Sequence, residues 1–249
     1  MPLMALRSDA HIQPRAVTAR EARDLSSVRS TLRNAKAVLF DVDSTLSPDE
    51  GIDELAGWLG KKAEVEALTS KAMNGDLAFE DAMRQRLQAM SPCHYDVQTM
   101  LSARPARITS GSQILISKLR RNGSEVFLVS GGFEQMVGQI ADAVGVSRSH
   151  ILANRLVFDQ HTGEFSGHDE SAFTARSGGK QYAAEYVRQQ VGGGPVVMVG
   201  DGATDMEART DGAADIFIGY GGVKRREKVE QEADHYVTDL WQLVNLIDK

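Results

Sequence analysis

The sequence predicts an α/β fold, in which a parallel sheet is covered by helices and a small helical domain is inserted. Two observations predict it. From Ile108 onward, short apolar runs alternate with segments of helical spacing, which is typical of a parallel sheet with helices on both faces. One further apolar run, at 37–40, is followed by residues 52–100, which show helical spacing throughout and no strand-like run.

The chain before the first strand is a lead-in that spans residues 1–33. It carries six arginines against three acidic residues. It is compatible with a flexible segment followed by a helix near 20–33, and also with an organelle transit peptide, although such peptides are usually poorer in acids. We therefore expect a cytoplasmic protein, with an organelle as the alternative.

The first strand is predicted at 37–40, where the run AVLF is fully apolar. The insert after it is predicted to contain four helices, because apolar residues recur three and four positions apart in each segment. These segments are 52–59, 62–73, 78–90 and 96–103, with breaks at 74–75 and 91–92. The expected domains are the lead-in, a core formed by 34–49 plus 107–249, and a helical cap at 50–106.

The remainder of the chain is predicted to alternate between helices and strands, with one hairpin. Helices are expected at 112–120, 133–145, 179–191, 206–213 and 224–233, strands at 125–130, 195–200, 215–220 and 235–238, and a hairpin at 155–167.

Composition narrows the function classes. The chain has 249 residues, 42% of them hydrophobic, and a net charge of −6, which suits a sizeable core and does not favour nucleic acid as a partner. The single cysteine, Cys93, excludes an internal disulfide framework. No apolar run approaches the roughly 20 residues that a membrane helix needs. We expect a small-molecule substrate, no nucleic acid and no membrane, and we leave a homodimer open.

The polar residues of interest follow the predicted strands. In a parallel sheet the carboxyl ends of the strands share one edge, where ligands bind near the switch in strand order. That edge would carry four carboxylates, one lysine and two glycine-rich turns. These are Asp41, Asp43, Asp201 and Asp205, Lys180, and the turns Ser130-Gly131-Gly132 and Gly200–Thr204.

Such a group of carboxylates calls for a cation, because like charges that share a site raise one another's pKa. A few oxygen ligands suit Mg²⁺, which binds through one or two carboxylates plus substrate phosphate. Backbone N–H groups of Ser130-Gly131-Gly132 and the charge of Lys180 would hold that phosphate. The sequence therefore predicts Mg²⁺-dependent phosphoryl transfer.

Three other motifs fit less well. A calcium loop that begins at Asp41 would need glycine and glutamate where Leu46 and Ile52 stand. The run ARSGGKQ lacks the first glycine and the Ser/Thr of a P-loop, and GDGATD has Asp205 in place of the third glycine of a dinucleotide fingerprint.

Asp41 and Asp43 have complementary chemical roles in such a reaction. A carboxylate can attack phosphorus and form an aspartyl-phosphate, which splits one difficult displacement into two easier ones. A carboxyl group two residues on points to the same side of an extended chain. Asp43 can then protonate the leaving alcohol and later accept a proton from water.

The same residues resemble the haloacid dehalogenase superfamily, whose four motifs match DVDST, SGG, SGGK and GDGATD. The resemblance extends from Asn34 to the C-terminus. It implies a Rossmann-like core with a helical cap inserted after the first motif. It further implies hydrolysis of O-phospho-L-serine to L-serine, the last step of the phosphorylated pathway of serine biosynthesis.

The resemblance also implies residue roles. Asp41 would be the nucleophile and Asp43 the acid–base. Mg²⁺ would be bound by the side chains of Asp41 and Asp201 and by the backbone carbonyl of Asp43, with Asp205 in support. The phosphate would be held by Ser130, Gly131, Gly132, Lys180 and Thr204.

In the cap, the resemblance implies that Glu50 binds the substrate ammonium and Arg86 its carboxylate, while Met73 and Phe79 close over it. One departure stands at Asn74, where the family usually has glycine. Asn74 keeps a backbone that could bind substrate, but its conformation need not be glycine-like.

Two alternatives stay open. One is a phosphotransferase of the same superfamily that passes the phosphoryl group to another alcohol such as homoserine. The other is a receiver-type module that carries a phosphorylated aspartate, although such modules lack a cap.

Overall fold

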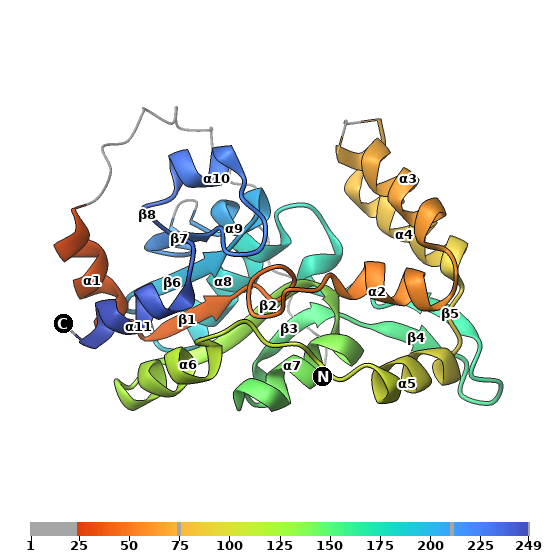
Figure 1. Cartoon of the computed structure of the whole chain (residues 1–249), viewed down its shortest axis with the longest axis horizontal. Helices are drawn as coiled ribbons and strands as arrows, with labels where there is room; N and C mark the ends of the chain where they lie inside the picture. Colours follow the sequence, from red (N-terminus) through yellow and green to blue (C-terminus); the bar gives the residue numbers. More distant parts are fainter. Residues whose placement is uncertain (1–23, 74–75, 210–211, 249) are drawn as a thin grey trace, which may run out of the picture.

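A parallel sheet forms the centre of the molecule (Figure 1). The computed structural model describes residues 24–73, 76–209 and 212–248. Within them, the six-stranded sheet has the order β3-β2-β1-β6-β7-β8, and every neighbouring pair is parallel. The strands are β1 (Ala37–Phe40), β2 (Glu125–Phe133), β3 (Ile151–Asn154), β6 (Val196–Gly200), β7 (Ile216–Tyr220) and β8 (His235–Val237). The predicted α/β, Rossmann-like class is confirmed.

Helices cover both faces of this sheet, and β1 shows why its residues are apolar throughout. Val38 and Phe40 pack into one hydrophobic core, whereas Ala37 and Leu39 pack into the other, because successive side chains point to opposite faces. The first core is completed by α1 (Leu25–Arg33), α6 (Ser112–Arg121), α7 (Glu134–Val144) and α11 (Leu240–Asp248). The second is completed by α8 (Gly179–Gln190), α9 (Ala203–Glu207) and α10 (Glu227–Glu232).

The insert between β1 and α6 is helical, as predicted. Its described part contains α2 (Gly51–Trp58), α3 (Lys62–Met73), α4 (Phe79–Met90) and α5 (His94–Ala103). A third hydrophobic core joins these helices to Phe133 and Met136 and to the hairpin of β4 (Leu156–Phe158) and β5 (Phe165–His168). The hairpin was expected in the core domain, but its apolar side chains pack against the insert. The division into lead-in, core and cap stays a prediction.

Several predicted bounds are wrong. The helix expected at 206–213 is α9, which begins at Ala203, because Asp205 accepts a hydrogen bond from the backbone N–H of Gly202 and caps the helix there. Strand β2 continues to Phe133 instead of ending at 130. Strand β3 and helix α11 were not predicted at all. The four residues of β3 follow directly on a short 3-10 helix at Arg148–His150, so no alternating pattern develops.

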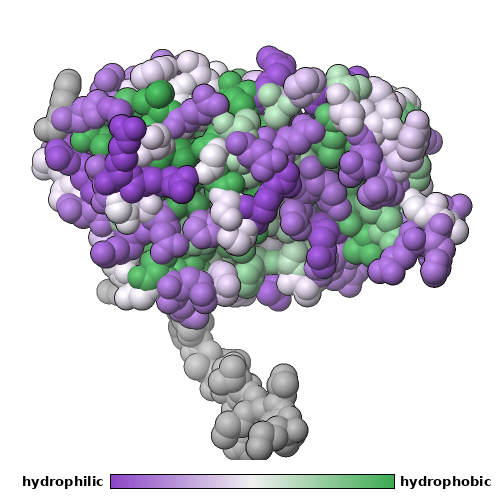
Figure 2. All heavy atoms as spheres, turned by 90° about the horizontal axis from the view of Figure 1, so that it is seen from below, coloured by the Kyte–Doolittle hydropathy of each residue, from purple (hydrophilic) through white to green (hydrophobic). Residues whose placement is uncertain are grey.

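The lead-in is described only from residue 24. Helix α1 lies within the segment expected to be helical, and residues 1–23 lie outside the described part. None of the described helices is both long and apolar enough to cross a membrane. On the face shown in Figure 2, hydrophobic side chains are interrupted by hydrophilic ones.

Candidate active site

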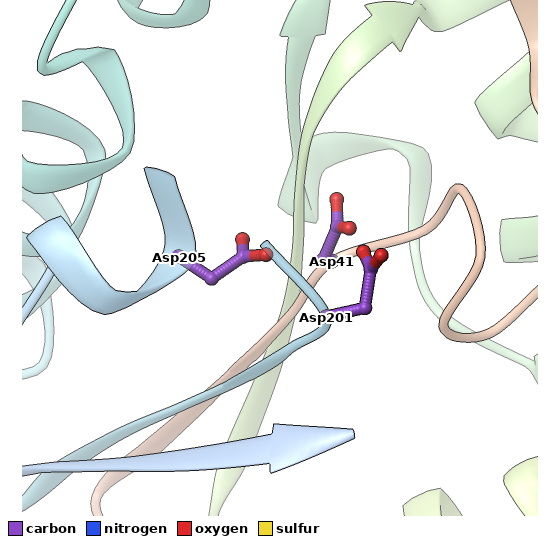
Figure 3. Close-up of side chains that lie close together, drawn as sticks. All are labelled: Asp41, Asp201 and Asp205. Atoms are coloured by element: carbon purple, nitrogen blue, oxygen red, sulfur yellow. The ribbon is translucent and has the colours of Figure 1, made fainter. Parts of the chain in front are cut away.

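Three buried carboxylates converge at the carboxyl edge of the sheet. Asp41 follows β1, Asp201 follows β6 and Asp205 lies in α9; one carboxylate oxygen of each lies within 4.8 Å of the others. Figure 3 shows the carboxylates of Asp41 and Asp201 side by side and that of Asp205 directed toward them. The predicted convergence of Asp41, Asp201 and Asp205 is therefore present.

The strand order explains this convergence. β1 and β6 are adjacent, yet the chain leaves β1 toward β2 on one side and returns to β6 on the other. Connections therefore diverge at this point and leave a crevice above the ends of the two strands, where ligands of such sheets bind. Asp41 and Asp201 both line this crevice.

Lys180 lies in the first turn of α8 and completes the cluster. Its Nζ lies 2.6 Å from Asp41 Oδ1 and 2.5 Å from Asp205 Oδ1, and its side chain is 9% exposed. Burial alone would lower the pKa of Lys180, but the carboxylates of Asp205 and Asp41 outweigh burial and raise it above its ordinary range. Lys180 is thus a fixed cation between two carboxylates.

One lysine does not neutralise this cluster. Burial and the charge of Asp41 raise the pKa of Asp205 to about 7, although Lys180 and the Gly202 N–H oppose them. The same two causes raise the pKa of Asp201 to about 6, against the opposing charge of Arg226. A site with carboxylate oxygens and surplus negative charge fits a divalent metal ion, and the residues that could hold one are Asp41, Asp201 and Asp205.

Asp43 lies at the border between the core and the insert. Its Oδ1 accepts a hydrogen bond from the N–H of Gly51 at 2.8 Å, and its Oδ2 accepts one from Ser130 Oγ at 3.3 Å. Burial, followed by the charge of Asp41, raises its pKa to about 7. A carboxyl group with this pKa can both give and take a proton near neutral pH.

Residues Ser130-Gly131-Gly132, predicted as a turn, form the end of strand β2 and pack against Asp43. A Cβ atom on Gly132 would lie 2.7 Å from Asp43 Oδ2, which explains the glycine. The carbonyl of Gly131 accepts a hydrogen bond from Asn154 Nδ2 at 2.8 Å. Asn154 thus holds the end of β2 from the neighbouring strand β3, and the sequence did not identify Asn154 because β3 itself was not predicted.

A cleft of about 260 Å³ opens above these groups, between the sheet edge and the insert. Phe79 and Arg86 line it from α4, and Glu50 lines it from the residue before α2. Ser130 is buried behind the lining, the side chain of Met73 is not described, and Asn74 lies outside the described residues. The predicted residues in the lining are Asp41, Asp43, Glu50, Phe79, Arg86, Gly131, Gly132, Lys180, Asp201, Thr204 and Asp205.

Arg86 is half-buried in the cleft, and its Nε donates to the carbonyl of Ala82 at 3.2 Å. Burial lowers the pKa of its guanidinium, while the charges of Asp53 and Glu50 oppose that shift. Arg84, two residues earlier, is exposed and pairs with Asp81 at 2.8 Å. The two arginines of α4 therefore occupy different environments.

Two cations from the loop between β7 and α10 also reach the site. Lys224 Nζ lies 2.6 Å from Glu50 Oε1, and Arg226 Nε lies 3.1 Å from Asp201 Oδ2. Neither residue was identified from the sequence. Their position in the sequence could have identified them, because the basic run KRR follows the carboxyl end of a predicted strand, where ligands bind.

A comparison with known protein families identifies the family of this chain. The model of the haloacid dehalogenase-like hydrolases matches residues 38–208, the span from β1 to the end of α9. This chain belongs to that family. The match includes all four motifs that carried the resemblance in the sequence.

Similar proteins within this family are described by a specific activity. The chain is 44% identical to the chloroplastic phosphoserine phosphatase of Arabidopsis thaliana, over 87% of this chain and 73% of the relative. It is 41% identical to the phosphoserine phosphatase of Mus musculus, over 90% of this chain and 98% of that one. A structure described as a phospho-aspartyl intermediate analogue of phosphoserine phosphatase matches with a TM-score of 0.72 and 29% identity, over 86% of this chain and 99% of the other.

Proposed function

We propose that this protein hydrolyses O-phospho-L-serine to L-serine and phosphate through an aspartyl-phosphate on Asp41. The observation that supports it most is the arrangement of Asp41, Asp43 and Lys180 at the floor of the cleft. The likeness to phosphoserine phosphatases over nearly the whole chain supports the choice of substrate. The reaction would be the last step of the phosphorylated pathway of serine biosynthesis.

In the first step, a carboxylate oxygen of Asp41 attacks phosphorus and the bond from phosphorus to the serine oxygen breaks. Lys180, whose Nζ lies 2.6 Å from Asp41 Oδ1, would bind the phosphoryl oxygens. Asp43, protonated at the start, donates its proton to the departing serine oxygen. Ser130, Gly131 and Gly132, at the end of β2, would bind the phosphoryl oxygens together with Thr204, which also lines the cleft. The N–H of Gly132 donates to Ser130 Oγ at 2.9 Å, so Gly132 would help through its fit to this backbone more than through a free N–H.

In the second step, water attacks the phosphorus of the aspartyl-phosphate. Asp43, now ionised, accepts a proton from that water, so phosphate leaves and Asp41 is regenerated as a carboxylate. The raised pKa of Asp43 suits both tasks, because the group must lose its proton in one step and regain it in the next.

The metal is proposed to be Mg²⁺. The side chains of Asp41 and Asp201 and the backbone carbonyl of Asp43 would hold it, and Asp205 would support the site through Lys180. When bound, Mg²⁺ supplies positive charge for the phosphoryl oxygens.

The two charges on the other side of the cleft suit the amino-acid part of the substrate. Glu50 offers a carboxylate for the ammonium, and Arg86 offers a guanidinium that can take the carboxylate in paired hydrogen bonds. Phe79 packs beside the bound serine. Met73 is proposed to close the cap over the substrate together with Phe79, and Asn74 to bind it through its backbone. We propose residues 50–106 as the cap and residues 34–49 plus 107–249 as the core.

Phosphate release from a panel of phosphorylated amino acids and sugars, with and without Mg²⁺, tests this proposal. We expect phosphoserine to be the best substrate and turnover to require the metal. Equal turnover of sugar phosphates would reject the assignment. Addition of homoserine to the assay would identify a phosphotransferase by formation of its phosphate ester. Membership of the hydrolase family makes a receiver-type module the weaker alternative.

Two broader expectations remain predictions. A homodimer would be identified by light scattering in solution. A fusion of residues 1–33 to a fluorescent reporter would separate a cytoplasmic location from an organelle, and the chloroplastic relative makes the organelle a reasonable alternative.

A further inference from the structure

Glu50 already has a cationic partner before any substrate binds. The ammonium of Lys224 lies 2.6 Å from Glu50 Oε1, and the same oxygen accepts a hydrogen bond from Ser44 Oγ at 2.6 Å. Glu50 is the carboxylate proposed to receive the substrate ammonium. A lysine ammonium and the ammonium of an amino acid are chemically alike: each is a primary ammonium with three donors.

The loop that carries Lys224 is anchored on both sides of it. On one side, the N–H of Gly221 donates to the carbonyl of Val237 at 2.8 Å. A Cβ on Gly221 would lie 1.8 Å from the hydroxyl of Tyr236, so the backbone is closely packed there. On the other side, Arg226 pairs with Asp201. The backbone at Lys224 is therefore held near the cleft.

The side chain of Lys224 is freer than its backbone. It is 45% exposed, whereas the side chain of Glu50 is 30% exposed. A half-exposed lysine on a long stem can turn into solvent, and exposed pairs of this kind contribute little to stability. Lys224 is thus held within reach of Glu50 by its backbone and bound there only weakly by its charge.

We propose that Lys224 is a displaceable occupant of the ammonium subsite, which the substrate ammonium must replace on Glu50. This inference rests on the proposed function. It makes Lys224 a residue that tunes specificity: a phosphate ester with an ammonium competes with Lys224, whereas an ester without one leaves the Lys224–Glu50 pair intact.

Removal of Lys224 should therefore have opposite effects on two esters. For phosphoserine, Lys224→Met removes the competitor, and KM should fall about threefold to fivefold, the range expected for a half-exposed ion pair. For 3-phosphooxypropanoate, which is the same ester without the ammonium, KM should rise about threefold or more. The reason is that, without Lys224, the Glu50 carboxylate would face this anionic ester with no cation to balance its charge.

Two matched variants accompany this measurement. Arg225→Met changes the neighbouring cation, which is 71% exposed and pairs with Glu230 instead of Glu50; it should shift neither KM. Lys224→Arg keeps the charge and should stay close to wild type for both esters, so a general disturbance of the loop would be recognised.

The possible outcomes distinguish failure of this inference from failure of the proposed function. A higher KM of Lys224→Met for phosphoserine would mean that Lys224 binds substrate, and unchanged values for both esters would mean that the pair is only a surface contact; either result overturns the inference alone. If the wild-type protein hydrolysed neither ester, the proposed function would fail and the inference with it.

Discussion

The carboxylate of Asp43 accepts a hydrogen bond from the backbone N–H of Gly51, the first residue of α2, across 2.8 Å. The residue proposed to move protons is thus tied to the first helix of the insert. A shift of α2 would therefore change the environment of Asp43 directly.

The raised pKa of Asp43 predicts a pH-dependent cost in stability for the metal-free protein. Its pKa is about 7 in the fold, whereas an unperturbed aspartate has a pKa of 3.8. The folded state holds the proton more tightly, so the stabilising contribution is complete below about pH 4 and is lost as pH rises through about 7. Asp43→Asn removes this dependence while its amide oxygen can still accept from Gly51.

We therefore expect Asp43→Asn to be more stable than wild type at pH 8, on the order of 3 kcal/mol, and nearly equal at pH 4. Urea unfolding in the presence of a chelator measures both differences. A difference that is the same at both pH values would contradict the assignment of the shifted pKa to Asp43.

The surplus negative charge around Asp41 and Asp201 predicts that Mg²⁺ stabilises the fold. A ligand that binds only the native state adds about 2.7 kcal/mol at one hundred times its dissociation constant. Thermal unfolding should shift upward with Mg²⁺ in wild type and hardly at all in Asp201→Asn. Asp142→Asn, which changes an exposed carboxylate paired with Arg148, should keep the full shift. A full shift in Asp201→Asn would exclude Asp201 as a ligand.

The environment of Arg86 predicts a selective loss of substrate recognition. Arg86→Ala should raise KM for phosphoserine about tenfold or more, equal to roughly 1.4 kcal/mol. It should barely change hydrolysis of p-nitrophenyl phosphate, which has no carboxylate. Arg84→Ala is the control on the same helix and should affect neither ester. Equal losses on both esters would mean that Arg86 supports the insert and does not recognise serine.

A contact across the cleft predicts a further effect on KM. Glu80 Oε1, in the first turn of α4, accepts a hydrogen bond from the N–H of Ser177 at 2.9 Å, three residues before Lys180. Loss of this bond in Glu80→Ala should raise KM for phosphoserine about fivefold, which corresponds to about 1 kcal/mol. Asp81→Ala, whose partner is the exposed Arg84, should have no such effect. Unchanged kinetics in Glu80→Ala would show that the contact does not hold the insert over the site.

The residues at the carboxyl ends of strands could be predicted from the sequence. Alternation of apolar runs and helices fixes a parallel sheet, and a parallel sheet brings Asp41, Asp201 and Lys180 to one edge whatever the details of the loops. The strand at 37–40 and the sequence directly after it were enough to place Asp41 and Asp43 at this edge. The same logic failed for Asn154, because four residues on an edge strand do not produce a detectable alternation.

Lys224 and Arg226 were missed for a different reason. Their contacts with Glu50 and Asp201 join segments that are far apart in sequence, and the irregular loop between β7 and α10 has no periodicity that directs a side chain. A run of basic residues is most often a solvated surface. Only the tertiary placement of this loop beside the crevice shows that its charges face the site.

The central claim is that Asp41 is the nucleophile of a phosphoserine phosphatase, and turnover of Asp41→Asn tests it most directly. Phosphate release from phosphoserine with saturating Mg²⁺ should fall by at least about a thousandfold, roughly 4 kcal/mol of barrier, because an amide cannot form the covalent intermediate. Circular dichroism and thermal unfolding should show that the variant is folded. A folded Asp41→Asn that kept more than about a tenth of wild-type turnover, a barrier change below roughly 1.4 kcal/mol, would contradict the claim.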